Sequence, residues 1–87
     1  METALTLLKI DLGIKTAAYD VRLYAVIESA IEMIQREGVE LDLENAEDAQ
    51  LVVMYAAWLW RRRDTGEGMP RMLRYTLNNR LFSQKMR

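Results

Sequence analysis

The sequence predicts an all-α fold, a compact bundle of about four helices: one short N-terminal helix and three longer ones, with an acidic extended loop between the second and third. Apolar residues recur at helical spacing in several segments, and capping residues or glycines bound those segments. The one alternating segment, Val39–Glu44, has no second strand to pair with. Because the chain has 87 residues, 51% of them hydrophobic, we expect a single domain over residues 1–87.

The first two helices are predicted over about Thr3–Leu12 and Ala18–Glu37. Thr3 is a candidate N-cap of the first helix, and Gly13 and Gly38 are candidate left-handed stops after the two helices. Each helix has one apolar stripe at helical spacing, which we expect to face the core. The stripes are Leu5, Leu8 and Leu12 in the first helix, and Leu23, Ile27, Ala30, Ile31 and Ile34 in the second.

The segment Val39–Glu44 alternates apolar and acidic residues, and we expect an extended loop that turns Val39, Leu41 and Leu43 inward. The third helix follows Asn45, a strong N-cap residue. Its segment Leu51–Trp60 has no polar side chain other than Tyr55, so all its faces are apolar and it is predicted to be the central core helix. Its surplus apolar surface further suggests that a neighbouring chain helps to cover it. The segment is too short to cross a bilayer, and no membrane association is expected.

The fourth helix is predicted from Pro70 to about Gln84, with Leu73, Leu77 and Leu81 as its core stripe. Arg80 projects near that stripe and needs either an acidic partner or a path to solvent. On nearly the opposite side lie Tyr75, Phe82 and Met86. A terminal helix with two apolar sides suits a subunit whose second face meets a neighbouring copy.

Charge is distributed unevenly along the chain. Residues 1–60 contain four basic and eleven acidic residues, a balance of -7, whereas residues 61–87 contain eight basic and two acidic residues, a balance of +6. Such a chain can bind copies of itself head to tail, or its basic end can face a polyanion, although both clusters also suit ordinary solvated surfaces. The candidate subunit-interface or DNA-path residues are Arg61, Arg62, Arg71, Arg74, Tyr75 and Phe82, and the candidate acidic partner patch is Glu40, Asp42, Glu44 and Glu47.

Catalytic chemistry is not expected. The chain has no Cys and no His, which excludes the usual nucleophilic triads and zinc sites, and the acidic loop lacks the central Gly and terminal Glu of an EF-hand. We therefore predict no enzyme, no cofactor and no metal. A small, dimeric nucleic-acid-binding regulator using the basic C-terminal half is the main alternative to an assembly protein, and a generic helical adaptor is a third. For the regulator, Trp58 and Trp60 are better placed as core residues than as base-stacking platforms.

Three segments resemble small helical head–tail connector proteins of phages and prophages. They are Gly68–Phe82 (GMPRMLRYTLNNRLF), Ala46–Arg61 (AEDAQLVVMYAAWLWR), and Tyr19-Asp20 at the opening of the second helix. The resemblance covers most of the chain, from about Leu5 to Lys85.

The resemblance implies a structural virion assembly protein rather than an enzyme. Its members form a ring of about a dozen subunits beneath the portal, a cyclic homo-oligomer that joins the DNA-filled head to the tail. The implied partners are the portal protein and tail-side connector proteins, with non-specific double-stranded DNA in the channel as a further expected contact. The implied location is the bacterial host cytoplasm during assembly, and then the head–tail junction of the virion. The family has no DNA-contacting motif that can be matched to residues of this chain.

Overall fold

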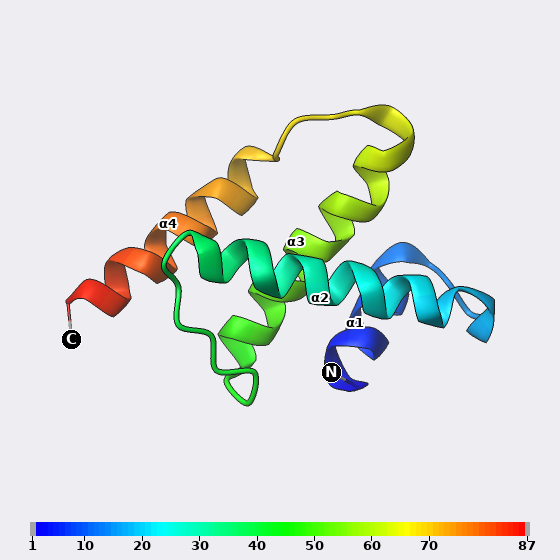
Figure 1. The fold of residues 1–87 in the computed structure, drawn as a ribbon, viewed down its shortest axis with the longest axis horizontal. Coiled ribbons are helices and arrows are strands. Elements are labelled where there is room, and N and C mark those ends of the chain that lie inside the picture. Colours follow the sequence, from blue (N-terminus) through cyan, green and yellow to red (C-terminus); the bar gives the residue numbers. More distant parts are fainter. Residues whose placement is uncertain (1, 87) are drawn as a thin grey trace.

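A computed structural model describes residues 2–86 and confirms the all-α bundle of about four helices. The helices are α1 (Glu2–Leu12), α2 (Asp20–Arg36), α3 (Ala46–Thr65) and α4 (Arg71–Lys85) (Figure 1). A short 3-10 turn, Ala17–Tyr19, precedes α2, so this helix begins two residues later than predicted. The molecule extends 42 × 28 × 18 Å.

The long helix α3 is the centre of the fold. It packs against α1 and α2, and α4 packs on it from another side. Figure 1 shows α1 and α4 on opposite sides of α3, with α2 running across it. The loop between α2 and α3 passes beside the C-terminal half of α4, so the acidic loop and α4 lie next to each other.

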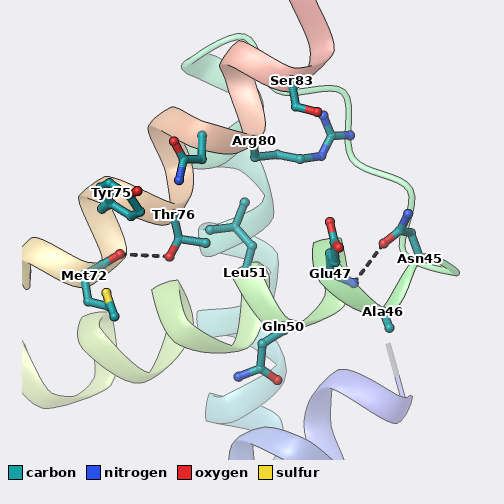
Figure 2. A pocket seen from close by; sticks show the side chains of 11 residues that line it. Asn45, Ala46, Glu47, Gln50, Leu51, Met72, Tyr75, Thr76, Arg80 and Ser83 are labelled. Atoms are coloured by element: carbon teal, nitrogen blue, oxygen red, sulfur yellow. Dashed lines mark hydrogen bonds between the residues drawn. The ribbon is translucent and has the colours of Figure 1, made fainter. Parts of the chain in front are cut away.

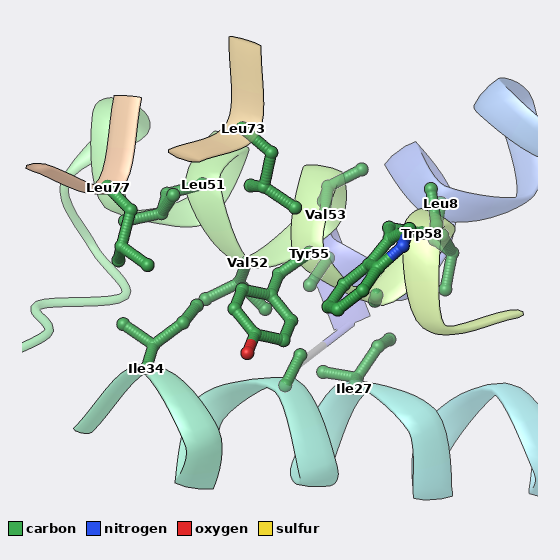
Figure 3. Packing of buried hydrophobic residues seen from close by; sticks show 14 of the residues in the cluster. Leu8, Ile27, Ile34, Leu51, Val52, Val53, Tyr55, Trp58, Leu73 and Leu77 are labelled. Atoms are coloured by element: carbon green, nitrogen blue, oxygen red, sulfur yellow. The ribbon is translucent and has the colours of Figure 1, made fainter. Parts of the chain in front are cut away.

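The chain's own helices bury most of α3. Leu51, Val52 and Val53 are at most 1% exposed, and Tyr55 and Trp58 are also buried (Figure 3). The prediction of a central core helix is therefore confirmed, whereas the expectation that a neighbouring chain helps to cover its surplus apolar surface is wrong for these residues. The physical reason is that α1, α2 and α4 together surround it, and a sequence pattern does not reveal how many helices cover one face.

Capping residues and glycines in the sequence correctly predict several of the helix ends. The Asn45 side chain accepts hydrogen bonds from the backbone N–H of Glu47 at 2.8 Å and of Asp48 at 3.4 Å, as expected for an N-cap. Gly13 and Gly38 have positive φ angles of 70° and 101°, as expected for left-handed stops.

Three local expectations are wrong. Thr3 does not cap α1, because the helix already includes Glu2 and Thr3 lies within its first turn. Pro70 immediately precedes α4 rather than forming its first residue, which leaves its backbone extended (ψ 141°). In the acidic loop Val39 is buried and Leu41 half-buried, but Leu43 is 39% exposed, because the chain turns just before α3 and carries that side chain outward.

Candidate interaction surfaces

The outer face of α4 is an exposed apolar stripe. Met72, Tyr75, Phe82 and Met86 are each between 63% and 72% exposed. Together with exposed Asn79 they are spaced by alternating steps of three and four residues, which is the spacing of a helix-packing seam. The opposite face of α4 is anchored in the core by Leu73 and Leu77, so α4 has the two apolar sides that the sequence predicts.

A buried ion pair joins α4 to the first turn of α3. The Arg80 guanidinium donates from Nε to Asp48 Oδ1 at 2.6 Å and from Nη2 to Oδ2 at 3.1 Å. Only 2% of the Asp48 side chain and 13% of the Arg80 side chain are exposed. The hydrogen bond to Asp48 raises the pKa of Arg80, so the guanidinium remains charged. The prediction that Arg80 needs an acidic partner is thereby confirmed.

Further polar contacts fasten the acidic loop to α4. Arg80 also donates to the Glu40 carbonyl at 2.7 Å. The Gln84 side chain donates to the Gly38 carbonyl at 2.8 Å and accepts from the Glu40 N–H at 2.7 Å. Arg74 donates to Glu37 at 2.7 Å. These contacts join residues far apart in the sequence, and no local pattern indicated the role of Gln84.

The site residues predicted on the basic side separate into two groups. Arg74 and Arg80 each pair with a carboxylate of the same chain, Arg74 with Glu37 just after α2 and Arg80 with Asp48. Arg61, Arg62 and Arg71 are exposed, and within residues 2–86 they form no ion pair with a carboxylate. The predicted interface set therefore contains one residue, Arg74, that already has an acidic partner in its own chain.

The arginines at the end of α3 are held against tryptophan rings. The Arg62 guanidinium lies 5.0 Å from the ring centroid of Trp58, and that of Arg63 lies 3.8 Å from the ring centroid of Trp60. Trp58 is buried and donates to the Glu67 carbonyl at 3.2 Å, which agrees with its prediction as a core residue. Trp60 is only half-buried. Stacking on an aromatic face restrains the guanidinium without neutralising its charge.

The residues of the acidic patch predicted from the sequence all lie on the surface. Glu40, Asp42, Glu44 and Glu47 are all exposed, and no basic residue occurs between Glu37 and Asp48. Within the loop the Asp42 carboxylate accepts the Glu44 N–H at 3.0 Å, which fixes the turn before α3. The four carboxylates therefore make a negative surface at the N-terminal end of α3.

A groove of about 670 Å³ lies between this acidic surface and the outer face of α4 (Figure 2). Met72, Tyr75 and Leu51 give it an apolar lining, while Glu47 and Gln50 from the start of α3 give it a polar side. In Figure 2 Tyr75 and Met72 lie across the groove from Glu47 and Asn45. The groove brings one residue of the predicted acidic patch, Glu47, together with one predicted interface residue, Tyr75.

The described part of the chain contains no cluster of side chains suited to hold a metal ion. Within residues 2–86 there is also no helix with the length and apolar character that a bilayer span requires. Comparison with protein-family models, with curated proteins and with solved structures finds no match for this chain.

Proposed function

We propose that this protein is a structural assembly protein, a head–tail connector subunit that forms a ring beneath a phage portal and joins the DNA-filled head to the tail. The observation that carries the proposal is the exposed apolar stripe of α4, Met72, Tyr75, Phe82 and Met86. A folded chain that leaves four large apolar side chains along one side of a helix in water has a surface suited to another protein.

The composition of the stripe suits a protein interface. Aromatic side chains and Met are enriched in protein interfaces, and two aromatics stand at the centre of this stripe. Burying each of these side chains contributes roughly 1.5–3 kcal/mol relative to leaving it in water. A contact between copies would recover that free energy, which the isolated chain does not.

Charge segregation supports a ring in particular. A cyclic ring needs a heterologous contact, in which two different surfaces of each copy are complementary. The acidic patch at the start of α3 and the free arginines at its end are two such surfaces. The connector assignment, with its portal and tail-side partners, its DNA-filled channel, and its location in the host cytoplasm and then in the virion, comes from the resemblance of residues 46–61 and 68–82.

The assembly part of the proposal is tested by molar mass. We expect concentrated wild-type protein to reach the mass of about a dozen copies in light scattering, and Phe82→Glu to remain a monomer, because it places a charge in the stripe. Ile10→Glu is the matched control, since Ile10 is 69% exposed on α1, comparable with Phe82 at 64%. Identical behaviour of the two variants would contradict a specific role for α4.

The connector part is tested in the phage itself, because some connectors assemble only on the portal. A nonsense mutation in this gene should yield DNA-filled heads and free tails that do not join, visible by electron microscopy. Complementation with wild-type protein should restore joined particles, and complementation with Phe82→Glu should not. Normal virions from the mutated gene would contradict the connector function.

One observation favours the second candidate, a nucleic-acid-binding regulator: Arg61, Arg62 and Arg71 are exposed and unpaired within residues 2–86. A regulator would behave as a dimer with an affinity for duplex DNA that falls steeply as salt rises. A connector-sized oligomer with no measurable affinity for DNA in free solution would favour the first candidate.

A further inference from the structure

The helix α3 joins two oppositely charged ends of the molecule. It has 20 residues and is therefore about 30 Å long. The acidic patch lies just before and at its first turn, and Arg61, Arg62 and Arg63 lie near its last turn. In Figure 1 the loop that precedes α3 and the loop that follows it are at opposite ends of the helix. Within one copy these two surfaces therefore cannot meet.

The acidic end also offers a place to dock. The groove of about 670 Å³ opens between Glu47 and the apolar side chains of Met72 and Tyr75. Arg80 lines the same groove, but its charge is already matched by Asp48. The groove thus combines apolar area with one carboxylate, Glu47, that forms no ion pair within residues 2–86, and it fits a surface that carries both apolar side chains and cations.

The other end of α3 has this complementary character. Arg62 and Arg63 are stacked on Trp58 and Trp60, so less side-chain entropy is lost when they pair with carboxylates. Trp60 is half-buried, and its ring meets Tyr19 edge to face with centroids 6.0 Å apart. Arg61 is exposed beside them. Arg61, Arg62 and Arg63 therefore lie near an aromatic pair that is open to solvent, while Asp11, Asp64 and Glu67 line the pocket beside Trp60 and Arg63 lies 3.9 Å from Asp64.

We propose that the arginine end of α3 in one copy docks into the α3–α4 groove of a second copy, against its acidic patch. The proposal rests on the proposed function, because it names the two surfaces that meet between neighbouring subunits. The contact is heterologous: each copy contributes its arginine end to one neighbour and its groove to the other, so copies add head to tail, which is the kind of contact that the ring of the proposed function requires. The receiving face includes Tyr75 and borders the rest of the α4 stripe, which the neighbour would cover.

The alternative self-contact, α4 against α4 of a second copy, is less favourable in charge. The helix α4 carries no acidic side chain. In an antiparallel pair Arg71 of one copy would lie near Lys85 of the other, and like charges facing each other across an interface are repulsive. The arginine end facing the acidic patch has the opposite, attractive arrangement.

A charge-swap experiment tests the docking directly. Variant A is Arg61→Glu with Arg62→Glu, and variant B is Glu40→Lys with Glu44→Lys; the loop side chains replaced in B form no ion pair within residues 2–86. Each variant alone should associate at least about tenfold more weakly than wild type in sedimentation, because like charges then face each other. An equimolar mixture of A and B, and a chain carrying all four substitutions, should associate as wild type does. The matched control, Lys15→Glu with Arg22→Glu, makes the same charge change as A at residues that belong to neither surface.

The outcomes separate this proposal from the proposed function. If A and B associate like wild type while Phe82→Glu does not, the docking surfaces are wrong and assembly through α4 stands. If A loses affinity for duplex DNA and neither the mixture nor the fourfold variant restores association, the arginine end serves a polyanion instead. Failure of the mixture to associate overturns the docking in either case.

Disulfide crosslinking can detect a contact that is too weak for sedimentation. Because the chain has no Cys, an introduced cysteine is its only thiol. Thr65→Cys places a thiol at the arginine end, and Ala46→Cys places one in the groove lining. Mixing these variants under oxidising conditions should give a 65–46 disulfide-linked dimer in at least about tenfold excess over the dimer formed with Thr3→Cys on α1, in line with the effective-concentration gain of a docked pair. Equal yields of the two dimers would overturn the docking.

Discussion

At the scale of single residues, Arg80 organises the contacts between α4 and the rest of the chain. Its guanidinium binds both oxygens of Asp48 and the carbonyl of Glu40, and Asp48 Oδ2 also accepts the Asp42 N–H at 2.9 Å. One side chain therefore fixes α4, the first turn of α3 and the acidic loop relative to one another. Buried ion pairs add little net stability over apolar packing, but removing one partner is costly. The arrangement sets where the acidic patch stands beside the stripe.

We predict that Arg80→Ala lowers the free energy of unfolding by about 3 kcal/mol, because it removes the guanidinium from a carboxylate that remains buried. Urea denaturation followed by circular dichroism measures this. The control is Arg36→Ala, which breaks an exposed pair with Glu32 one turn away and should cost less than about 0.5 kcal/mol. Equal losses in the two variants would show that burial of the Arg80 pair is unimportant.

Tyr55 gives the fold a dependence on alkaline pH. Burial, and next the charge of Glu37, raise the pKa of the Tyr55 hydroxyl above its ordinary value of 10.0. The folded state therefore holds this proton more tightly than the unfolded state, so the contribution of Tyr55 to stability is constant below pH 10 and is lost as pH rises through the raised pKa. We expect Tyr55→Phe to show a shallower loss of stability above pH 10 than wild type in denaturation curves. Parallel curves would contradict this role of Tyr55.

At the scale of elements, α4 packs on the core with one face and exposes apolar side chains on the other. Leu73 and Leu77 hold it on α3, while Tyr75 and Phe82 face water. Because these residues lie on nearly opposite sides, the outer face can be changed without disturbing the inner one. This separation makes the proposed assembly surface testable without unfolding the chain.

We predict opposite effects for truncations on the two faces of α4. Leu77→Ala should lower the free energy of unfolding by about 2–5 kcal/mol, because Leu77 is 1% exposed and its loss leaves a cavity. Phe82→Ala should change it by less than about 0.5 kcal/mol, as expected for an exposed surface side chain. In sedimentation, however, Phe82→Ala should weaken association. A large stability loss in Phe82→Ala would mean that its ring packs within the chain.

The sequence was sufficient for the elements whose signals are local. Helical periodicity placed all four α-helices, Asn45 marked the start of α3, and the stripe of Tyr75, Phe82 and Met86 was predicted on the outer face of α4. Arg80 was expected to need an acid, but its partner Asp48 is 32 residues away and periodicity gives no register between distant segments. For the same reason the sequence did not predict the Arg74–Glu37 pair or the hydrogen bonds of Gln84 to the acidic loop. It also led to the expectation that a neighbouring chain helps to cover α3, which is wrong for the buried residues Leu51, Val52 and Val53.

At the scale of the whole molecule, a net charge of -1 conceals a strong polarity. The carboxylates gather at the N-terminal end of α3 and the free arginines at its C-terminal end, and each group complements the helix dipole there. In the proposed assembly, this polarity would orient copies head to tail even though their net charges are small. The apolar stripe beside the acidic patch would then add short-range packing once the copies are oriented.

This division of roles predicts how assembly responds to salt. Raising NaCl from 0.1 M to 1 M shortens the Debye length from about 10 Å to about 3 Å, so attraction between the charged ends should weaken. We expect sedimentation to show at least about tenfold weaker association at the higher salt, because the orienting charges act largely through solvent at the rim. The fourfold charge-swapped chain should respond in the same way, since its ends are again opposite in sign. Unfolding of the monomeric Phe82→Glu chain should change far less, because its core is apolar. Association that strengthens with NaCl would mean that the stripe alone joins the copies and that the arginine end does not dock.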